Sequence, residues 1–265
     1  MRSVLAALDF DECARPVLGT AIALAGLLDA SAVALHVCEP GVASPKELAD
    51  AAGVQLHEVS GTPIEQIVAA AREPEIAALV LGTRGAPGGP QPAGHTAIEV
   101  ITQLAKPVAV APPHAQPREQ FARLLVPLEG TSESSRALDD TISLAHRRQL
   151  KIVVLHVHSP ATVPAFSNHE PHATQAWDQE FLARHLTAPH DRVKLLRHLG
   201  APAEEVAAIA DEATADLLVL AWSQDLAQGR GQVVSETLAR SSIPVLLLPV
   251  LDRHRPSKRS EAAAQ

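Results

Sequence analysis

A glycine-rich loop is the segment of this sequence best suited to hold a ligand. Residues 82–96 read GTRGAPGGPQPAGHT and include Gly82, Gly85, Gly88, Gly89 and Gly94. Glycines leave backbone N–H groups unshielded, and the N-terminus of a following helix favours negative charge, so the loop can bind phosphate. Thr96 and Glu99 also have the T-x-x-E spacing of a capping box, which fits a plain connection. Spacing alone leaves both interpretations open.

Three polar side chains lie in or near positions from which they could contact such a ligand. Asp9 follows an apolar run, where it could accept a hydrogen bond from an exocyclic amine or serve as a turn or cap residue. His95 could donate to a phosphate or be a solvated loop side chain. Arg84 could pair with a phosphate or remain in solvent.

The chain contains one pattern twice, which indicates a duplicated unit. Five segments recur in the same order, two at an offset of 120 residues, two at 139 and one at 137: VLAALDF with LLVPLEG, ALHV with VLHV, GTPIEQIVAAA with GAPAEEVAAIA, LVLG with LVLA, and KPVAVAP with IPVLLLP. The second copy therefore has 19 extra residues between 157 and 200 and two fewer between 221 and 244. The extra residues predict a loop and a longer second helix.

Short apolar runs alternate with Ala-rich segments of helical period in each copy. We expect strands at 3–8, 32–38, 54–59, 77–82 and 107–111, and helices at 13–28, 44–52, 63–72 and 96–104. The second copy repeats this order with strands at 122–128, 151–157, 191–199, 216–221 and 243–249, and helices at 132–147, 171–187, 202–213 and 232–240. The fold class is α/β, with two tandem doubly wound five-stranded parallel-sheet sandwiches.

This arrangement predicts where a site would lie. In open parallel sheets, ligands bind beyond the carboxyl ends of the strands, where the strand order reverses. The loops after the first, second and fourth strands carry Asp9, Val37 and Gly82. We expect the copies to span 1–113 and 121–250, followed by a polar tail at 251–265, and to pair through their final strands as an intramolecular pseudo-dimer.

Composition limits the partners. A net charge of −8 provides no strong positive field for nucleic acid or for an anionic membrane surface. No apolar stretch approaches the ~20 residues of a membrane helix, the first residues lack the features of a signal peptide, and the two cysteines are not in a CxxC motif. We therefore expect a cytoplasmic protein.

The order strand-Asp, strand-His-Val, strand-G-x-x-G loop and strand-Pro-Val resembles the universal stress protein family over both copies. That family has an adenine-nucleotide-binding branch marked by G-x-x-G, nine residues and G-[ST]. Gly82 and Gly85 match the opening and Thr96 the end, whereas His95 occupies the last glycine position and Gly94 comes one residue early. The resemblance implies an adenine-nucleotide alpha-hydrolase-like fold.

The resemblance also implies roles for single residues. Asp9 and the backbone around Val37 would meet adenine, Gly82 and Gly85 would border the ribose and phosphates, and Gly94, His95 and Thr96 would meet the phosphates. The implied cofactor is ATP, which Mg²⁺ could accompany.

The second copy departs from this pattern. Ala221 and Gln224 replace the two opening glycines, Glu129 replaces Asp9, and the loop is two residues shorter. With the bulk of Trp222, these changes are expected to crowd a nucleotide pocket. We therefore expect the site of this copy to be lost or remodelled, although Gly229, Arg230 and Gly231 keep a weak anion-binding hypothesis open.

Motifs of several other α/β chemistries were not found. The first strand-helix turn has neither GxGxxG nor GxxxxGK[ST], and no GxSxG occurs. A receiver domain is excluded because Val59, Ser60 and Gly61 end the third strand without an Asp and Lys106 precedes the fifth strand. The nearest histidines, at 156, 158, 169 and 172, have no Cys or acidic residue at ligand spacing, so we expect no metal site.

The leading hypothesis is a universal stress protein whose first copy binds an adenine nucleotide, ATP, as a regulatory ligand, with trace hydrolysis at most. The alternative is a nucleotide-independent interaction module that binds an unknown protein partner. A third hypothesis is a sensor or enzyme that uses the divergent second pocket around Glu129 and Trp222. Whether two chains form a homodimer stays open.

Overall fold

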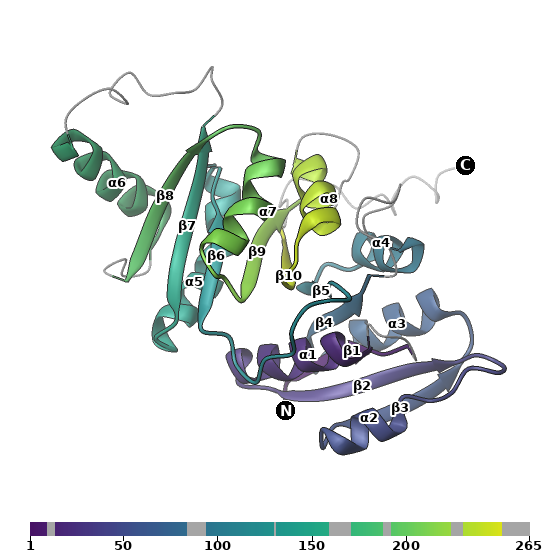
Figure 1. The fold of residues 1–265 in the computed structure, drawn as a ribbon. Coiled ribbons are helices and arrows are strands. Elements are labelled where there is room, and N and C mark those ends of the chain that lie inside the picture. The colour runs from purple at the N-terminus through teal and green to yellow at the C-terminus, as the bar shows by residue number, and fades with distance from the viewer. Residues whose placement is uncertain are drawn as a thin grey trace, which may run out of the picture.

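The computed structural model describes residues 1–9, 14–83, 94–129, 131–158, 171–187, 192–223 and 230–250. The described elements of the first half are, in order, β1 (Ser3–Ala7), α1 (Ala14–Leu28), β2 (Ser31–Cys38), α2 (Lys46–Ala51), β3 (Gln55–Ser60), α3 (Pro63–Arg72), β4 (Ile76–Gly82), α4 (His95–Gln103) and β5 (Val108–Ala111) (Figure 1).

The second half repeats this order of elements: β6 (Arg123–Pro127), α5 (Ser132–Arg147), β7 (Lys151–His158), α6 (Pro171–His185), β8 (Val193–Leu199), α7 (Pro202–Glu212), β9 (Leu217–Trp222), α8 (Arg230–Arg240) and β10 (Val245–Pro249). The predicted longer second helix is confirmed, because α6 has 15 residues where α2 has six. The loop expected before α6 lies outside the described residues.

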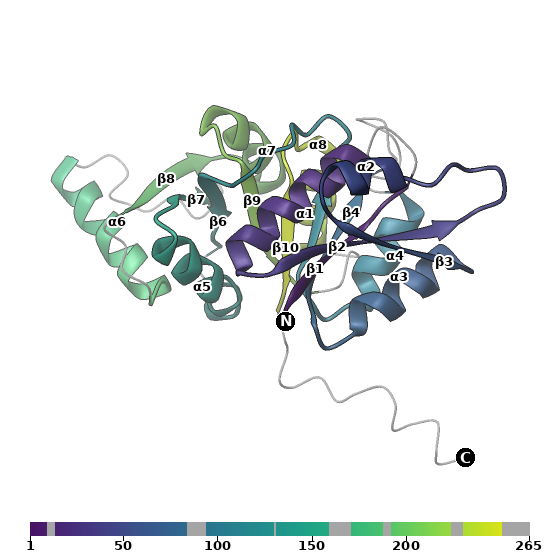
Figure 2. The same cartoon turned by 90° about the horizontal axis from the view of Figure 1, so that it is seen from below.

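All ten strands form one sheet in the order β3-β2-β1-β4-β5-β10-β9-β6-β7-β8. Pairing is parallel within each half, and β5 pairs antiparallel with β10, where Ala109 faces Leu246. The expected pairing of the final strands is therefore confirmed, and Figure 2 shows the two halves side by side across it. Because the seam is antiparallel, the carboxyl ends of the strands in the two halves point in opposite directions.

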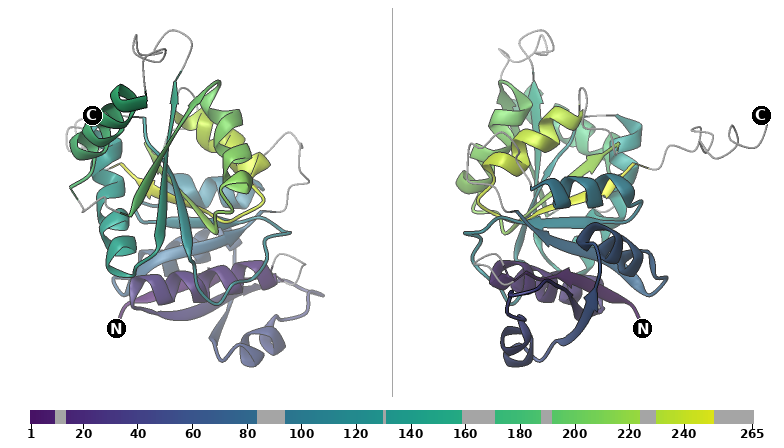
Figure 3. Two further views of the ribbon diagram at one scale, coloured as in Figure 1. Left: turned by 60° about the vertical axis from the view of Figure 1, so that its left-hand side comes forward. Right: turned by 90° about the vertical axis from the view of Figure 1, so that its right-hand side faces the viewer.

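Helices cover both faces of the sheet, as the doubly wound fold requires (Figure 3). Buried residues of α1, α5 and α6 form one core cluster, represented by Leu24, Ile142 and Phe181. Buried residues of α3, α4, α7 and α8 form the other cluster on the opposite face. The strands between the helices have nearly continuous apolar sequences, such as LVL in β4, because both of their faces are buried.

The linker between the halves is anchored in its middle and where it enters β6. Pro117 packs so closely on α1 that a Cβ on Gly19 would lie 2.8 Å from the Cβ of Pro117. The buried Asp216 carboxylate pairs with the next residue, Arg118, at 2.9 Å. It also accepts hydrogen bonds from the backbone N–H groups of Ala122 and Arg123, at the end of the linker, at 2.7 and 2.9 Å. These contacts fix where β6 begins. Among the described helices, none is long and apolar enough to cross a membrane.

Candidate functional site

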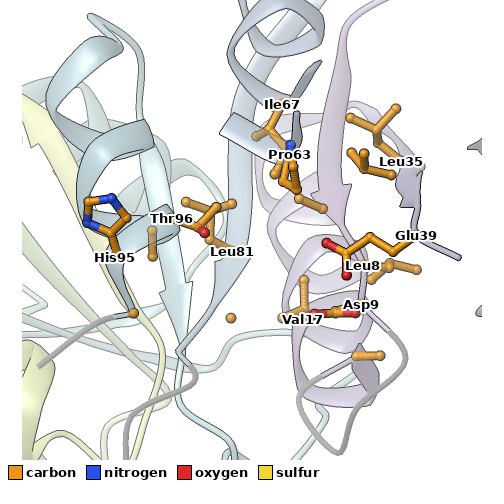
Figure 4. A pocket seen from close by; sticks show the side chains of 16 residues that line it. Leu8, Asp9, Val17, Leu35, Glu39, Pro63, Ile67, Leu81, His95 and Thr96 are labelled. Atoms are coloured by element: carbon orange, nitrogen blue, oxygen red, sulfur yellow. The ribbon is translucent and has the colours of Figure 1, made fainter. Parts of the chain in front are cut away.

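A cavity of about 300 Å³ opens at the carboxyl ends of β1, β2 and β4. The strand order reverses between β1 and β4, so this is the position where a doubly wound sheet binds ligands. The first turns of α1, α3 and α4 complete the walls, and Figure 4 shows the side chains that line the cavity.

One wall is held in place by a buried histidine. The Nδ1–H of His36 donates to the backbone carbonyl oxygen of Leu8 at 3.0 Å, and the Leu8 N–H donates to the carbonyl oxygen of Leu35 at 2.8 Å. Both bonds join β2 to the residue just before Asp9. Since His36 is buried, this bond is shielded from water and fixes the backbone from which Asp9 projects.

Two carboxylates lie on this side of the cavity. Asp9 follows β1 and Glu39 follows β2, and Figure 4 shows their side chains next to each other, across the cavity from His95 and Thr96. Sequence reasoning identified Asp9 and missed Glu39. The signal available for Glu39 was its place directly after the second strand, where the crevice was already expected.

The opposite wall is the N-terminus of α4. The first backbone bond of this helix runs from the Ile98 N–H to the Gly94 carbonyl oxygen at 3.1 Å. The N–H groups of His95, Thr96 and Ala97 therefore have no partner within the helix, and they carry the positive end of its dipole. Such a helix end attracts an anion such as phosphate.

The capping box predicted from Thr96 and Glu99 is wrong. Gly94 is the N-cap, so Thr96 lies inside the first turn of α4 rather than at its start. Glu99 contacts His95 instead, with 3.0 Å between its Oε1 and the imidazole Nε2. The prediction failed because the helix begins two residues earlier than a cap at Thr96 requires. Thr96 consequently lines the cavity.

The floor between these walls is apolar. It is formed by Val17 of α1, Leu35 and Val37 of β2, Ile67 of α3 and Leu81 of β4. A flat, weakly polar ring can therefore lie between the carboxylates and the helix end, with its edge within reach of both. This arrangement suits a ligand that carries hydrogen-bond donors at one end and negative charge at the other.

The structure brings six predicted site residues together around one cavity: Asp9, Val37, Gly82, Gly94, His95 and Thr96. The other two predicted residues, Arg84 and Gly85, lie outside the described residues. The contributions of Pro63 and Ile67 from α3 were missed, because nothing in their local sequence distinguishes them from ordinary helix residues.

The sequence profile of the universal stress protein family matches residues 44–112 and 120–249. This chain belongs to that family. Each matched range lies in one of the two copies, which supports a tandem universal stress protein. The first range begins after β2, so Asp9 and Val37 are placed at the site by the structure rather than by the match.

Solved structures share the fold of this universal stress protein over nearly its whole length. A protein of unknown function from Pseudomonas aeruginosa PAO1 is similar with a TM-score of 0.66 and 14% identity, covering 94% of this chain and 93% of that one. A universal stress protein from Archaeoglobus fulgidus DSM 4304 has a TM-score of 0.63 and 16% identity, covering 94% and 97%. A comparison with curated proteins finds no match.

A shorter universal stress protein is similar to half of the chain. The Archaeoglobus fulgidus protein in complex with dAMP covers 48% of this chain and 98% of its own, with 17% identity and a TM-score of 0.33.

The second copy of this universal stress protein has a smaller cavity at the equivalent place. It measures about 150 Å³ and lies at the carboxyl ends of β6, β7 and β9. Its lining residues occupy the positions equivalent to those of the first cavity, with Glu129 in place of Asp9 and Ser134 in place of Ala14. The site of the second copy is therefore remodelled into a smaller cavity at the same place.

Further substitutions and an earlier helix start distinguish the second cavity. Val233 stands at the position of Thr96, Val234 at that of Ala97 and Ala221 at that of Gly82, so each adds bulk or removes a hydroxyl. The helix α8 begins at Arg230, two residues earlier than α4 in the aligned repeat. The prediction that Trp222 crowds the pocket is wrong, because its side chain is buried in the core.

Three histidines of the second copy, His156, His158 and His185, lie in an aromatic cluster. The rings of His156 and His158 are 4.4 Å apart, and Phe181 of α6 lies 4.6 Å from His156 and 4.7 Å from His185. Across the part of the chain that the structure describes, no group of three or more His, Cys, Asp or Glu side chains could hold a metal ion. His169 lies outside that part.

Proposed function

We propose that the N-terminal copy of this universal stress protein binds an adenine nucleotide, with ATP as its regulatory ligand. The observation that carries the proposal is the polarity of the larger cavity, with carboxylates on one wall and the N-terminus of α4 on the other (Figure 4). Membership of the family and the position at the strand-order reversal support the same assignment.

The fit follows from the chemistry of each wall. Adenine would lie on the apolar floor between Val37 and Ile67, with its exocyclic amine donating to Asp9. The ribose hydroxyls would reach Glu39, and the first phosphate would accept hydrogen bonds from the N–H groups of Thr96 and Ala97. A cavity of about 300 Å³ is at the lower end of ligand sites and suits the adenosine end of the molecule.

The proposed role is regulatory. The carboxylates of Asp9 and Glu39 lie across the cavity from the helix end that would hold the phosphates, so they are badly placed to activate a water at phosphorus. For the same reason, Mg²⁺ that enters with ATP would be held by phosphate oxygens and water rather than by these carboxylates.

The test is isothermal titration of the full chain with ATP, AMP and adenosine. We expect ATP to bind with a Kd on the order of 10 μM and adenosine to bind more weakly, because it lacks the group that α4 attracts. The change Asp9→Asn keeps the size of the side chain and removes its charge. It should weaken ATP about tenfold, since a hydrogen bond to a charged group contributes about 1.5 kcal/mol.

The matched control is Glu129→Gln, the same change in the second cavity, which should leave ATP binding unaltered. An ATP titration without saturation up to about 10 mM would remove the proposal and favour a nucleotide-independent role. Equal effects of the two substitutions would show that ATP does not select the N-terminal cavity.

A further inference from the structure

The second cavity keeps the frame of the first and loses the part that suits an anion. We propose that it binds a small, mainly apolar molecule with a cationic head, such as an aromatic amine, and that Glu129 contacts the head. This site is independent of the nucleotide site proposed for the N-terminal copy.

The retained frame is a pair of backbone contacts. The Nδ1–H of His156 donates to the carbonyl oxygen of Leu128 at 2.7 Å, and the Leu128 N–H donates to the carbonyl oxygen of Leu155 at 2.8 Å. These bonds repeat those of His36 and Leu8 at the equivalent positions. The carboxylate that follows, Glu129, is thus held at the rim of the second cavity as Asp9 is in the first.

The lost part is the polar end of the helix wall. Val233 presents no hydroxyl where Thr96 does, and Val234 lies where the small Ala97 leaves room. Because α8 begins at Arg230, the N–H of Val234 is already four residues into the helix and is directed at the Arg230 carbonyl. A phosphate at this wall would therefore meet two valine side chains in place of free N–H groups.

The remaining lining is apolar. Ten of the twelve described residues around the cavity have hydrocarbon side chains, and the exceptions are Glu129 and Ser134. The Ser134 hydroxyl lies 2.7 Å from the Thr131 hydroxyl and 3.2 Å from the Thr131 carbonyl oxygen, at the start of α5. Glu129 is exposed, and its carboxylate is the charged group among the described residues that line the cavity.

The size selects small molecules. The cavity measures about 150 Å³, and an apolar cavity of ~150 Å³ is enough to hold a benzene ring. A single ring therefore fits, with its charged substituent at Glu129. A nucleotide base with ribose and phosphate does not. Buried apolar surface would supply most of the affinity, since an exposed ion pair contributes little.

The experiment uses the full chain and three probes of one shape: benzylamine, benzyl alcohol and benzoate. Ligand-observed NMR titrations are made with AMP at a saturating concentration, so that AMP occupies the N-terminal cavity. If benzylamine binds equally well with and without AMP, the N-terminal cavity does not contribute to its binding. We expect benzylamine to bind with a Kd on the order of 1 mM. Benzyl alcohol should bind about threefold more weakly. Benzoate should show no saturation.

Two matched variants test the role of the carboxylate. Glu129→Gln should weaken benzylamine about threefold and leave benzyl alcohol unchanged, whereas Asp9→Asn should change neither. Circular dichroism confirms that both variants are folded.

The proposal is overturned if benzylamine shows no saturation up to about 10 mM, if benzoate binds as tightly as benzylamine, or if Glu129→Gln has no effect on benzylamine. Competition by AMP would also overturn it, because the ring would then be in the first cavity. If ATP fails to bind while benzylamine binds, only the proposed nucleotide function is lost.

Discussion

The two copies have the same arrangement of strands, and the equivalent cavities differ in their lining residues. In both, a histidine of the second strand holds the carbonyl of the residue before an acidic side chain, through His36 in the first copy and His156 in the second. In the first copy the opposite wall is a helix N-terminus with a threonine and an alanine, and in the second it is two valines. We therefore expect the side chains and the start of one helix to decide which kind of ligand each cavity accepts, on an unchanged arrangement of strands.

The copies also differ in how deeply their first helix is buried. Leu24 of α1 is fully buried, while Leu144, its equivalent in α5, is only partly buried. We expect Leu24→Ala to lower the free energy of unfolding by about 3 kcal/mol and Leu144→Ala by about 1 kcal/mol. Urea unfolding followed by circular dichroism measures both. Equal losses would show that the two helices contribute equally to the core.

We expect the helix wall to be the difference that most directly sets the ligand class. The double change Thr96→Val with Ala97→Val gives the first copy the wall of the second. It should weaken ATP about 30-fold, or ~2 kcal/mol, because a hydroxyl is lost and the wall is crowded. Calorimetric titration measures the change, and an unaltered melting temperature shows that the fold is intact.

The reciprocal change, Val233→Thr with Val234→Ala, serves as the control for the wall comparison. It should not create an ATP site, because α8 still begins at Arg230 and Ala221 still replaces the glycine of the first copy. ATP binding to this cavity after only two substitutions would show that the earlier helix start has no role.

Much of this could be predicted from sequence because the signal was periodic. Apolar runs and repeat offsets predict the strands to within two residues and indicate the crevice, so the sequence alone points to Asp9, Val37 and Gly82. The failures concern local competition. Thr96 and Glu99 fit a capping box, but Gly94 begins the helix, and the side chain of Trp222 turned into the core rather than the cavity.

Glu39 was missed for a different physical reason. Its place directly after β2 indicated the crevice, but whether its side chain points into that crevice depends on the backbone path of the loop. The same holds for α3, whose Pro63 and Ile67 reach the cavity only because the helix packs on the sheet at that height. Residues that line a site from neighbouring elements require the tertiary structure.

The shared histidine frame predicts a smaller effect that should separate the copies. His36→Leu leaves the carbonyl of Leu8 without its buried donor, and should cost about 1–2 kcal/mol of stability. Because that bond positions Asp9, the variant should also weaken ATP binding about threefold. His156→Leu should lower stability without altering ATP binding. If both variants bind ATP like the wild type, the histidine holds the fold and does not position Asp9.

The smallest predicted effect is a pH dependence confined to the second copy. His185 lies at the end of α6, against Phe181 and 3.2 Å from the Ser135 hydroxyl. Burial, with smaller contributions from the charges of Arg184 and His156, lowers the pKa of His185 below its ordinary value of 6.5. Between the lowered pKa of the folded state and the ordinary value of 6.5, the unfolded chain therefore binds more protons than the folded one. The contribution of His185 to stability is complete above about pH 6.5 and is lost as the pH falls below it.

Asp178 in the same helix acts in the opposite direction at lower pH. Burial raises its pKa above 3.8 despite the attraction of Arg197, so its contribution to stability is lost as the pH rises through the window above 3.8. The change His185→Gln should remove the loss of stability below pH 6.5. The control His57→Gln, at an exposed position of β3, should leave that loss unchanged. Hydrogen exchange can be measured at about pH 7.5 and about pH 5.5. In the wild type, α6 should open more often at the lower pH, with no matching change in α2. Equal acceleration in both helices would mean that the pH response belongs to the whole sheet rather than to the aromatic cluster under α6.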